Sequence, residues 1–408
     1  MGIDSNSPDK RMKNTLQLLH DHGQSVWLDY LRRSLITSGE LKRLIAEDGV
    51  RGLTSNPSIF EKAIADSGEY GDILATPESQ VLDAKALYEQ IAVRDIQDAA
   101  DILRCVYVES NRRDGYVSLE VSPKLAHDTN GTLIEARRLW QTVSRENLMI
   151  KVPATQEGIP AVQQLVSEGI NVNVTLLFAQ EAYEQVAAAY LNGLEDLVHS
   201  GGDLSKVGSV ASFFISRIDS AVDAVIAERL KASTSPGEQS DLRRLLGAVA
   251  CASAKVTYQK YLEIFSGDRW HALRHHGAHT QRLLWASTGT KNPAYRDVRY
   301  VEGLIGRDTV NTIPPATLDA FRDHGCVRST LIENLHEADR LLDLARELGI
   351  PLKKLTDQLL DDGLKQFSDA FDKLLAITTR GARKTEVDPN GFLESKMVKE
   401  LYDGQHHA

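Results

Sequence analysis

The chain has 408 residues, and its 57 Asp and Glu against 47 Lys and Arg give a formal net charge of −10 at pH 7. The acidic excess is spread without long runs of one sign, which argues against the basic surface that a nucleic-acid partner needs. A hydrophobic content of 42% with 25% charged residues is ordinary for a folded globular protein and excludes a disordered or fibrous one. Three widely spaced cysteines, Cys105, Cys251 and Cys326, exclude a disulfide scaffold.

No part of the sequence is suited to a membrane. The first residues, MGIDSNSPDKRMKN, lack the apolar core of a secretory signal. No apolar run approaches the ~20 residues that a membrane-spanning helix needs. We therefore expect a cytoplasmic protein without a membrane partner.

Eight short apolar stretches recur along the chain, each followed by a longer amphipathic stretch, as in residues 134–143, 161–168 and 180–194. Repeated strand–helix units predict a parallel sheet covered by helices. Eight units without a GxGxxG after the first strand favour a closed (β/α)8 TIM barrel over an open dinucleotide-binding sheet. The expected strands are SVWLDY (25–30), GVRGLTSNP (49–57), GYVSLEVSP (115–123), NLMIKVPAT (147–155), GINVNVTLLF (169–178), KVGSVASFFIS (206–216), RLLWASTGT (282–290) and DTVNTIPPA (308–316).

A plain barrel needs only about 250 residues, so we expect additional helices within a single domain over 1–408. The apolar spacing predicts a leading helix over 8–22, a helical insertion over about 218–280 between the sixth and seventh strands, and a helical C-terminal extension over about 329–380. The linker-like stretch ASTSPGEQ (232–239) is expected as a surface loop inside the insertion.

The lysine at the end of the fourth strand is the leading catalytic candidate. Lys151 directly follows an apolar run, and reacting groups of (β/α)8 barrels lie at the carboxyl ends of the strands. A lysine desolvated by apolar walls loses proton affinity and becomes a nucleophile that can form an imine with a ketose carbonyl. The alternatives are a snorkelling lysine and one half of a structural ion pair.

Polar residues on the neighbouring strands are expected to share the inward face with Lys151, because side chains two apart on a strand point the same way. Asn173 and Thr175 have this parity on the fifth strand. Glu120 ends the third strand and places a carboxylate beside the amine, either to shuttle protons or as a structural counter-ion. Asp29 ends the first strand as a second inward carboxylate.

Other polar candidates follow the second and sixth strands. Asn56 is a candidate amide or, alternatively, an Asx-turn residue. Ser212 and Phe214 share a face of the sixth strand, and Arg217 begins the next helix with a guanidinium suited to phosphate. We expect these residues to face the same pocket.

The seventh strand ends at Ser287, and Gly289 and Lys291 follow in a loop whose amide groups suit a phosphate. Taken singly, Lys291 is an ordinary solvated charge. In an acidic chain, a second cation near the strand ends indicates an anion site.

These segments resemble transaldolases from about residue 24 to residue 375. TSNPSIF, SLEVSP, NLMIKVPAT, NVTLLF and VASFFISR are similar to the family's strand-end blocks in the family's order, and ASTGTKNP is most similar to the longer bacterial subgroup. The resemblance implies transfer of a dihydroxyacetone unit, in the non-oxidative pentose phosphate pathway, from sedoheptulose 7-phosphate or fructose 6-phosphate to glyceraldehyde 3-phosphate or erythrose 4-phosphate. It implies sugar phosphates as partners and no cofactor or metal; we expect a monomer or a homodimer.

The resemblance also implies roles for individual residues. Lys151 would be the Schiff-base lysine, Glu120 and Thr175 would hold the catalytic water, and Asp29 would be the acid/base for carbon–carbon cleavage. The residues implied in substrate binding are Asn56 and Asn173 for the hydroxyls and the imine, and Ser212 and Arg217 for the phosphate.

One position departs from the family pattern. Shorter members place a phosphate-binding arginine two residues after the strand-seven serine, whereas here Ser287 is followed at that distance by Gly289. We take Lys291 as the substitute.

Three other functions stay open. His271, His275 and His279 recur at a spacing that suits a metal-dependent barrel enzyme, although Gly277 interrupts that helix and no carboxylate cluster accompanies them. A non-catalytic phosphosugar-binding regulator is disfavoured by the intact set of reactive side chains. An aldolase that releases dihydroxyacetone would share nearly all of these residues, but Phe214 offers no proton to a bound enamine.

Overall fold

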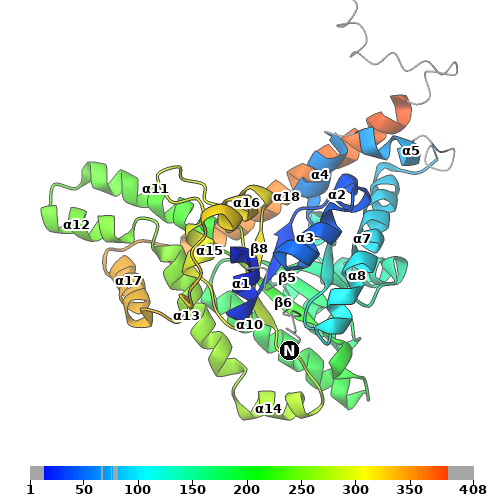
Figure 1. The fold of residues 1–408 in the computed structure, drawn as a ribbon. Coiled ribbons are helices and arrows are strands. Elements are labelled where there is room, and N and C mark those ends of the chain that lie inside the picture. The colour runs from blue at the N-terminus through cyan, green and yellow to red at the C-terminus, as the bar shows by residue number, and fades with distance from the viewer. Residues whose placement is uncertain (1–12, 66–67, 75, 77–80, 385–408) are drawn as a thin grey trace, which may run out of the picture.

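The chain folds into a closed barrel of eight parallel strands, in a computed structural model that describes residues 13–65, 68–74, 76 and 81–384 (Figure 1). Each strand is hydrogen-bonded to the next in chain order, and β1 pairs with β8. The predicted (β/α)8 barrel is confirmed, and each strand overlaps its predicted segment. The strands are β1 Gln24–Asp29, β2 Val50–Thr54, β3 Tyr116–Glu120, β4 Leu148–Pro153, β5 Val172–Leu177, β6 Ser209–Phe214, β7 Arg282–Ala286 and β8 Thr309–Ile313.

The register of the strands decides which side chains meet inside the barrel. Glu120 on β3 pairs with Lys151 on β4, and Lys151 pairs in turn with Asn173 on β5. Strands β3, β4 and β5 are buried along their whole length, as is typical of parallel strands covered on both faces. The charged and amide groups therefore lie side by side in a water-poor environment.

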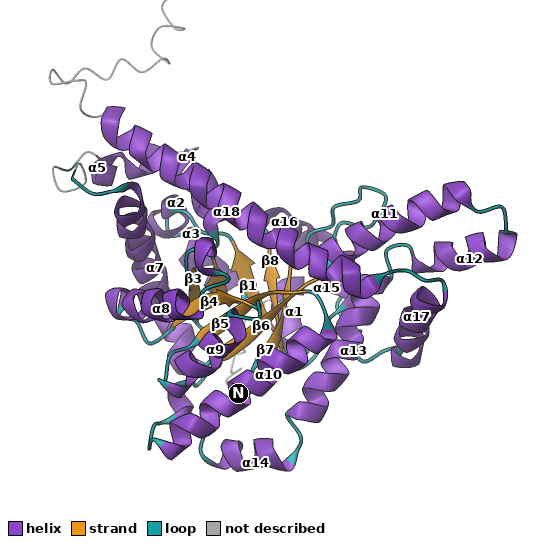
Figure 2. Ribbon diagram, turned by 180° about the vertical axis from the view of Figure 1, so that it is seen from behind, coloured by secondary structure: helices purple, strands orange, loops and turns teal. Residues whose placement is uncertain are grey.

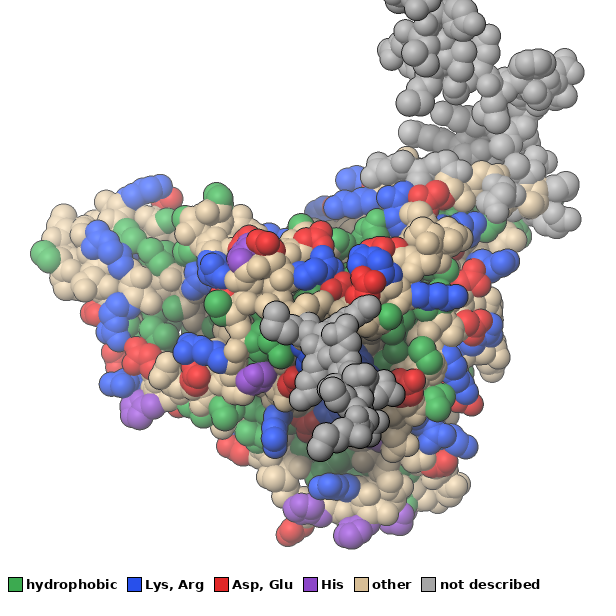
Figure 3. Space-filling view, viewed as in Figure 1, with side chains coloured by type: hydrophobic (Ala, Val, Ile, Leu, Met, Phe, Trp, Pro, Cys, Tyr) green, Lys and Arg blue, Asp and Glu red, His purple; other side chains and the backbone are tan. Residues whose placement is uncertain are grey.

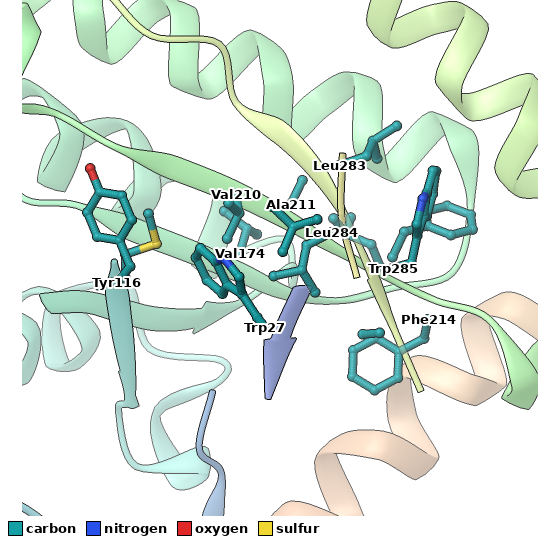
Figure 4. Packing of buried hydrophobic residues seen from close by; sticks show 14 of the residues in the cluster. Trp27, Tyr116, Val174, Val210, Ala211, Phe214, Leu283, Leu284 and Trp285 are labelled. Carbon is teal, nitrogen blue, oxygen red and sulfur yellow. The ribbon is translucent and has the colours of Figure 1, made fainter. Parts of the chain in front are cut away.

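An apolar layer fills the barrel below these strand ends. The rings of Trp27 and Tyr116 lie 6.2 Å apart, and Figure 4 shows Trp27 among Val210 and Leu284 in this layer. Gly52 makes room for the indole, because a Cβ at Gly52 would lie 2.5 Å from the Trp27 ring. The layer gives the polar strand ends a solid floor.

Helices cover the barrel and fill the connections between strands. The predicted helices at 134–143, 161–168 and 180–194 are confirmed as parts of α8, α9 and α10. A leading helix was predicted over 8–22, and α1 confirms its second half. Residues 8–12 of that prediction lie outside the described residues. The helices are α1 Thr15–Asp21, α2 Arg33–Thr37, α3 Glu40–Asp48, α4 Pro57–Ala65, α5 Gly71–Leu74, α7 Ala84–Glu109, α8 Thr129–Val143, α9 Gly158–Ser167, α10 Gln180–His199, α15 Arg299–Gly303 and α16 Pro315–His324, with 3-10 turns η1 Gly68–Tyr70, η2 Pro123–Leu125 and η3 Leu204–Lys206.

The predicted insertion between β6 and β7 consists of four helices: α11 Ser216–Ala232, α12 Pro236–Leu245, α13 Val249–Ile264 and α14 Asp268–His275. Helices α11 and α12 form an arm that extends from the barrel (Figure 1). The surface loop predicted over 232–239 is wrong in its second half, because Pro236 begins α12. The side chain of Ser235 accepts a hydrogen bond from the Glu238 amide, so the Ser-Pro pair starts a helix rather than a linker.

The C-terminal extension forms α17 Leu335–Glu347 and α18 Leu352–Lys384, as predicted. Helix α18 crosses the barrel and contacts α4, α7, α11 and β5 (Figure 2). Its aromatic side chains Phe367 and Phe371 are buried, and the Phe371 ring packs edge-on against Tyr88 of α7 at 5.7 Å. Because 367 and 371 are one helical turn apart, both rings point toward the barrel.

We expect Phe371→Ala to lower the free energy of unfolding by about 3–5 kcal/mol, because it opens a cavity under α18. Urea denaturation measures this change. Lys365→Ala on the exposed face of the same helix is the control, with an expected change within about 0.5 kcal/mol. Equal small changes in both variants would contradict the packing of α18 on the barrel.

Candidate active site

A cavity of about 170 Å³ opens at the carboxyl ends of the strands. All of the predicted site residues except Glu120 and Asn173 line it. A larger cleft of about 1630 Å³ lies outside the barrel between α10 and α17, and it contains none of them. The lining residues of the smaller cavity are Asp29, Thr54, Asn56, Lys151, Thr175, Ser212, Phe214, Arg217, Ala286, Ser287, Gly289, Lys291, Thr312, Pro314 and Phe367.

The Lys151 amine is buried and weakly held. Lys151 is 4% exposed, and its Nζ donates a 3.4 Å hydrogen bond to the Ser55 carbonyl oxygen. The nearest carboxylate oxygen, Oε2 of Glu120, lies 3.6 Å away, and the Phe367 ring centroid lies 5.7 Å from Nζ. An amine with one long hydrogen bond and one long ion pair keeps little of the solvation that it has in water.

Glu120 adjoins the amine from the β3 side. Burial raises the pKa of Glu120 to about 7, and the neighbouring Lys151 limits the rise. Its Oε2 and the Oγ1 of Thr175 are buried and have no hydrogen-bond partner within the described parts of the chain. Glu120 borders a small separate cavity with Tyr88 and Glu135 instead of lining the main one. Each of these oxygens suits a hydrogen bond from or to a water molecule, because buried polar groups otherwise carry a desolvation cost.

Asp29 provides the second carboxylate. It is half-buried and accepts a 3.1 Å hydrogen bond from Thr54 Oγ1, which lies 3.0 Å from Thr312 Oγ1. Burial raises the pKa of Asp29, while the charge of Lys151 and the Thr54 hydrogen bond oppose the rise. The threonine pair holds the carboxylate in one orientation.

The two predicted asparagines occupy different layers. Asn173 is fully buried below the cavity, where its Oδ1 accepts from Ser212 Oγ at 2.7 Å and its Nδ2 donates to Ser118 Oγ at 3.0 Å. Asn56 lines the cavity, and its Oδ1 accepts the Ile59 amide at 2.9 Å. Asn56 Oδ1 therefore caps the first turn of α4 by a bond to the third residue along, and the Asx-turn alternative, which needs the second, is wrong. Asn173 supports Ser212 from beneath.

The cationic side of the cavity combines α11 with the loop after β7. Arg217 is half-buried, with its Cζ 5.4 Å from the Phe214 ring centroid, and burial lowers its pKa while Asp29 opposes this. Ser287 adopts a left-handed backbone conformation with φ of 56°, and its Oγ lies 3.0 Å from Ser216 Oγ. Lys291 is exposed at the rim. The predicted cations thus face one cavity.

Phe367, Thr54 and Thr312 belong to the site although sequence reasoning missed them. The two threonines lie near the carboxyl ends of β2 and β8, and a polar residue at that position of a predicted strand could have indicated them. Phe367 lies far along the chain, and its apolar helical spacing with Phe371 indicates only a buried helix face.

The histidines at metal-like spacing do not gather into a site. His271 and His275 are exposed on α14, and Figure 3 shows histidine side chains on the surface over this helix. In the described ranges, no three His, Cys, Asp or Glu side chains are grouped so as to hold a metal ion.

Within the same ranges, no helix combines the length and apolar character of a membrane span.

The fold and the cavity define an enzyme of the (β/α)8-barrel class, with its ionisable groups at the strand ends. The family model described as transaldolase/fructose-6-phosphate aldolase matches residues 26–378. A transaldolase of Trichodesmium erythraeum is 47% identical over 367 residues, which cover 89% of this chain and 96% of the relative. A transaldolase of Thiobacillus denitrificans is 49% identical over 354 residues, or 87% of this chain and 96% of the relative. The chain therefore belongs to the transaldolase/fructose-6-phosphate aldolase family and is an enzyme of the transaldolase type, which confirms the resemblance.

We expect kcat/KM to rise with pH through about 7, because below the pKa of Glu120 this carboxyl holds a proton and cannot accept the one that leaves the Lys151 amine as the imine forms. Glu120→Gln should lower turnover and remove this limb from the pH profile. Glu135→Gln, which borders the same small cavity, is the control that should keep it. A limb that persists in Glu120→Gln would assign the titration to another group.

Proposed function

We propose that this enzyme transfers a dihydroxyacetone unit through an imine on Lys151. The donor would be sedoheptulose 7-phosphate or fructose 6-phosphate, and the acceptor glyceraldehyde 3-phosphate or erythrose 4-phosphate. The observation that carries the proposal is a buried, weakly paired amine on a cavity that Arg217 and Lys291 also line. These reactants belong to the non-oxidative pentose phosphate pathway, and we propose a cytoplasmic monomer or homodimer that carries out this step.

The imine forms by addition of the Lys151 amine to the ketose carbonyl carbon. Protonated Glu120 then gives its proton to the hydroxyl of the carbinolamine, and water leaves as the protonated imine forms. The Glu120 carboxylate and the Thr175 hydroxyl hold that water, consistent with the unpartnered oxygens of both side chains within the described residues. Hydrolysis of the product imine runs through the same steps in reverse.

The carbon–carbon bond breaks when the Asp29 carboxylate removes the proton of the hydroxyl on the fourth carbon. The electron pair of the bond between the third and fourth carbons passes into the protonated imine, and the aldose phosphate leaves an enamine behind. Asp29 returns the proton to the alkoxide when the enamine adds to the acceptor aldehyde. The imine is the electron sink, so this mechanism assigns no step to a metal or organic cofactor.

The remaining side chains of the cavity position the sugar phosphate. Asn56 and Ser212 offer polar groups to the hydroxyls, and Asn173 fixes the orientation of Ser212. Arg217 and Lys291, with Ser287 nearby, bind the phosphate by charge-assisted hydrogen bonds.

Borohydride reduction in the presence of fructose 6-phosphate should leave a three-carbon adduct on Lys151, because it converts the imine to a stable amine. Peptide mass mapping identifies the modified residue. Lys151→Arg should show neither adduct nor turnover, since a guanidinium stays protonated and does not attack a carbonyl. Lys255→Arg is the control, since Lys255 lies on α13 and does not line the cavity. An adduct on a different lysine would contradict the proposal.

Phe214 favours transfer of the three-carbon unit to an acceptor over its release as free dihydroxyacetone. Its side chain lines the cavity and has no proton to give to the enamine. We expect little free dihydroxyacetone from fructose 6-phosphate unless erythrose 4-phosphate is present. Phe214→Tyr adds a hydroxyl in the same pocket and should increase acceptor-independent release, because the phenol can protonate the enamine carbon.

A coupled assay for dihydroxyacetone measures both proteins with and without the acceptor. Phe178→Tyr is the control, since the Phe178 ring packs on Phe214 at 5.3 Å without lining the cavity. Fast release by the unmodified enzyme would favour an aldolase.

A further inference from the structure

The loop that carries Lys291 is hydrogen-bonded to the helical insertion. Tyr295, four residues further along, donates its hydroxyl to Asp223 Oδ2 at 2.7 Å. The other carboxylate oxygen, Asp223 Oδ1, accepts the Gly247 amide at 2.8 Å. One carboxylate of α11 therefore joins the loop after β7 to the turn between α12 and α13.

A second carboxylate of α11 repeats this arrangement one helical turn earlier. Asp219 Oδ2 accepts from the Tyr300 hydroxyl at 3.0 Å, and Asp219 Oδ1 accepts the Ala250 amide at 2.7 Å. Because residues four apart lie on one face of a helix, both carboxylates point to the same side of α11. The segment from the Lys291 loop to α15 is thus fastened at two points.

The contact around Tyr295 is closely packed. The Arg299 guanidinium carbon lies 4.3 Å from the Tyr295 ring centroid, and Arg299 donates to the Gly247 carbonyl. Gly247 has φ of 62°, and a Cβ there would lie 2.6 Å from the Tyr295 ring. Within the loop, Thr290 Oγ1 donates to the carbonyls of Arg296 and Asp297 at 3.0 Å. The backbone beside Lys291 is therefore held on both sides.

We infer that Tyr295 is a positioning residue for phosphate binding, which holds the Lys291 loop in register with Arg217 on α11. This inference rests on the proposed function, because it takes Arg217 and Lys291 as the phosphate ligands. The same helix bears Arg217 and Asp223, so the bond from Tyr295 ties the two cations to one rigid element. A lysine on a fixed loop loses less conformational entropy on binding than one on a loose loop.

The Tyr295 hydroxyl remains a donor at neutral pH. Burial and its bond to Asp223 raise the pKa of Tyr295 to about 12, with Arg299 opposing the rise. The contact is therefore present across the range in which the enzyme is assayed.

The test compares Tyr295→Phe with the unmodified full-length enzyme. We expect the KM for fructose 6-phosphate and the inhibition constant of inorganic phosphate each to rise about three- to tenfold, with kcat within about twofold. Asp223→Ala, which removes the carboxylate that accepts from the Tyr295 hydroxyl, should give the same pattern. Adding Tyr295→Phe to Lys291→Ala should raise the inhibition constant of phosphate little further, because both substitutions act on the contact between Lys291 and the phosphate.

Tyr261→Phe is the matched control, because Tyr261 donates a 2.9 Å hydrogen bond to Asp308 at the amino end of the barrel. It should leave phosphate inhibition unchanged. An unchanged inhibition constant in both Tyr295→Phe and Asp223→Ala, or full additivity with Lys291→Ala, would overturn the inference while leaving the proposed reaction intact. No effect of Lys291→Ala on phosphate would instead reject Lys291 as a phosphate ligand, and the inference with it.

Discussion

The burial of one amine against one carboxylate is the constraint on which this structure depends. Lys151 and Glu120 have side chains only 5% exposed, with 3.6 Å between Nζ and Oε2. Taking both charges out of water costs several kcal/mol, and a pair at this distance returns only part of that cost. The barrel sustains the pair because the register of β3 and β4 fixes it and the close packing keeps most of both side chains from solvent. The resulting rise in the pKa of Glu120 is the property that the proposed chemistry uses.

A barrel that contains charges at both ends must keep them apart. At the amino end, Arg282 donates to Ser25 and Asp114 at 2.8 Å, in a buried network of its own. The apolar layer that contains Trp27 and Leu284 lies between this network and the cavity. The network at the amino end is therefore satisfied by its own hydrogen bonds, and the reactive groups lie at the opposite strand ends.

The additions beyond a plain barrel act on the cavity at its carboxyl end. Helix α18 covers it with Phe367, and the insertion supplies α11, whose first turn carries Arg217. In the proposed reaction, the Phe367 ring helps to exclude water from the enamine, which would favour transfer over release. The cover comes from the C-terminal extension and the cation from the insertion, so residues far apart in sequence complete one site.

The sequence by itself determined the strands and the inward parity of Asp29, Lys151 and Thr175, because hydrophobic runs and the two-residue period of a strand are local properties. It did not determine the place of Asn173 below the cavity or of Phe367 above it. Those positions depend on strand register and on where a long helix docks, and both are set by packing between residues more than twenty positions apart. Only the tertiary structure decided which polar groups touch the cavity and which support it from behind.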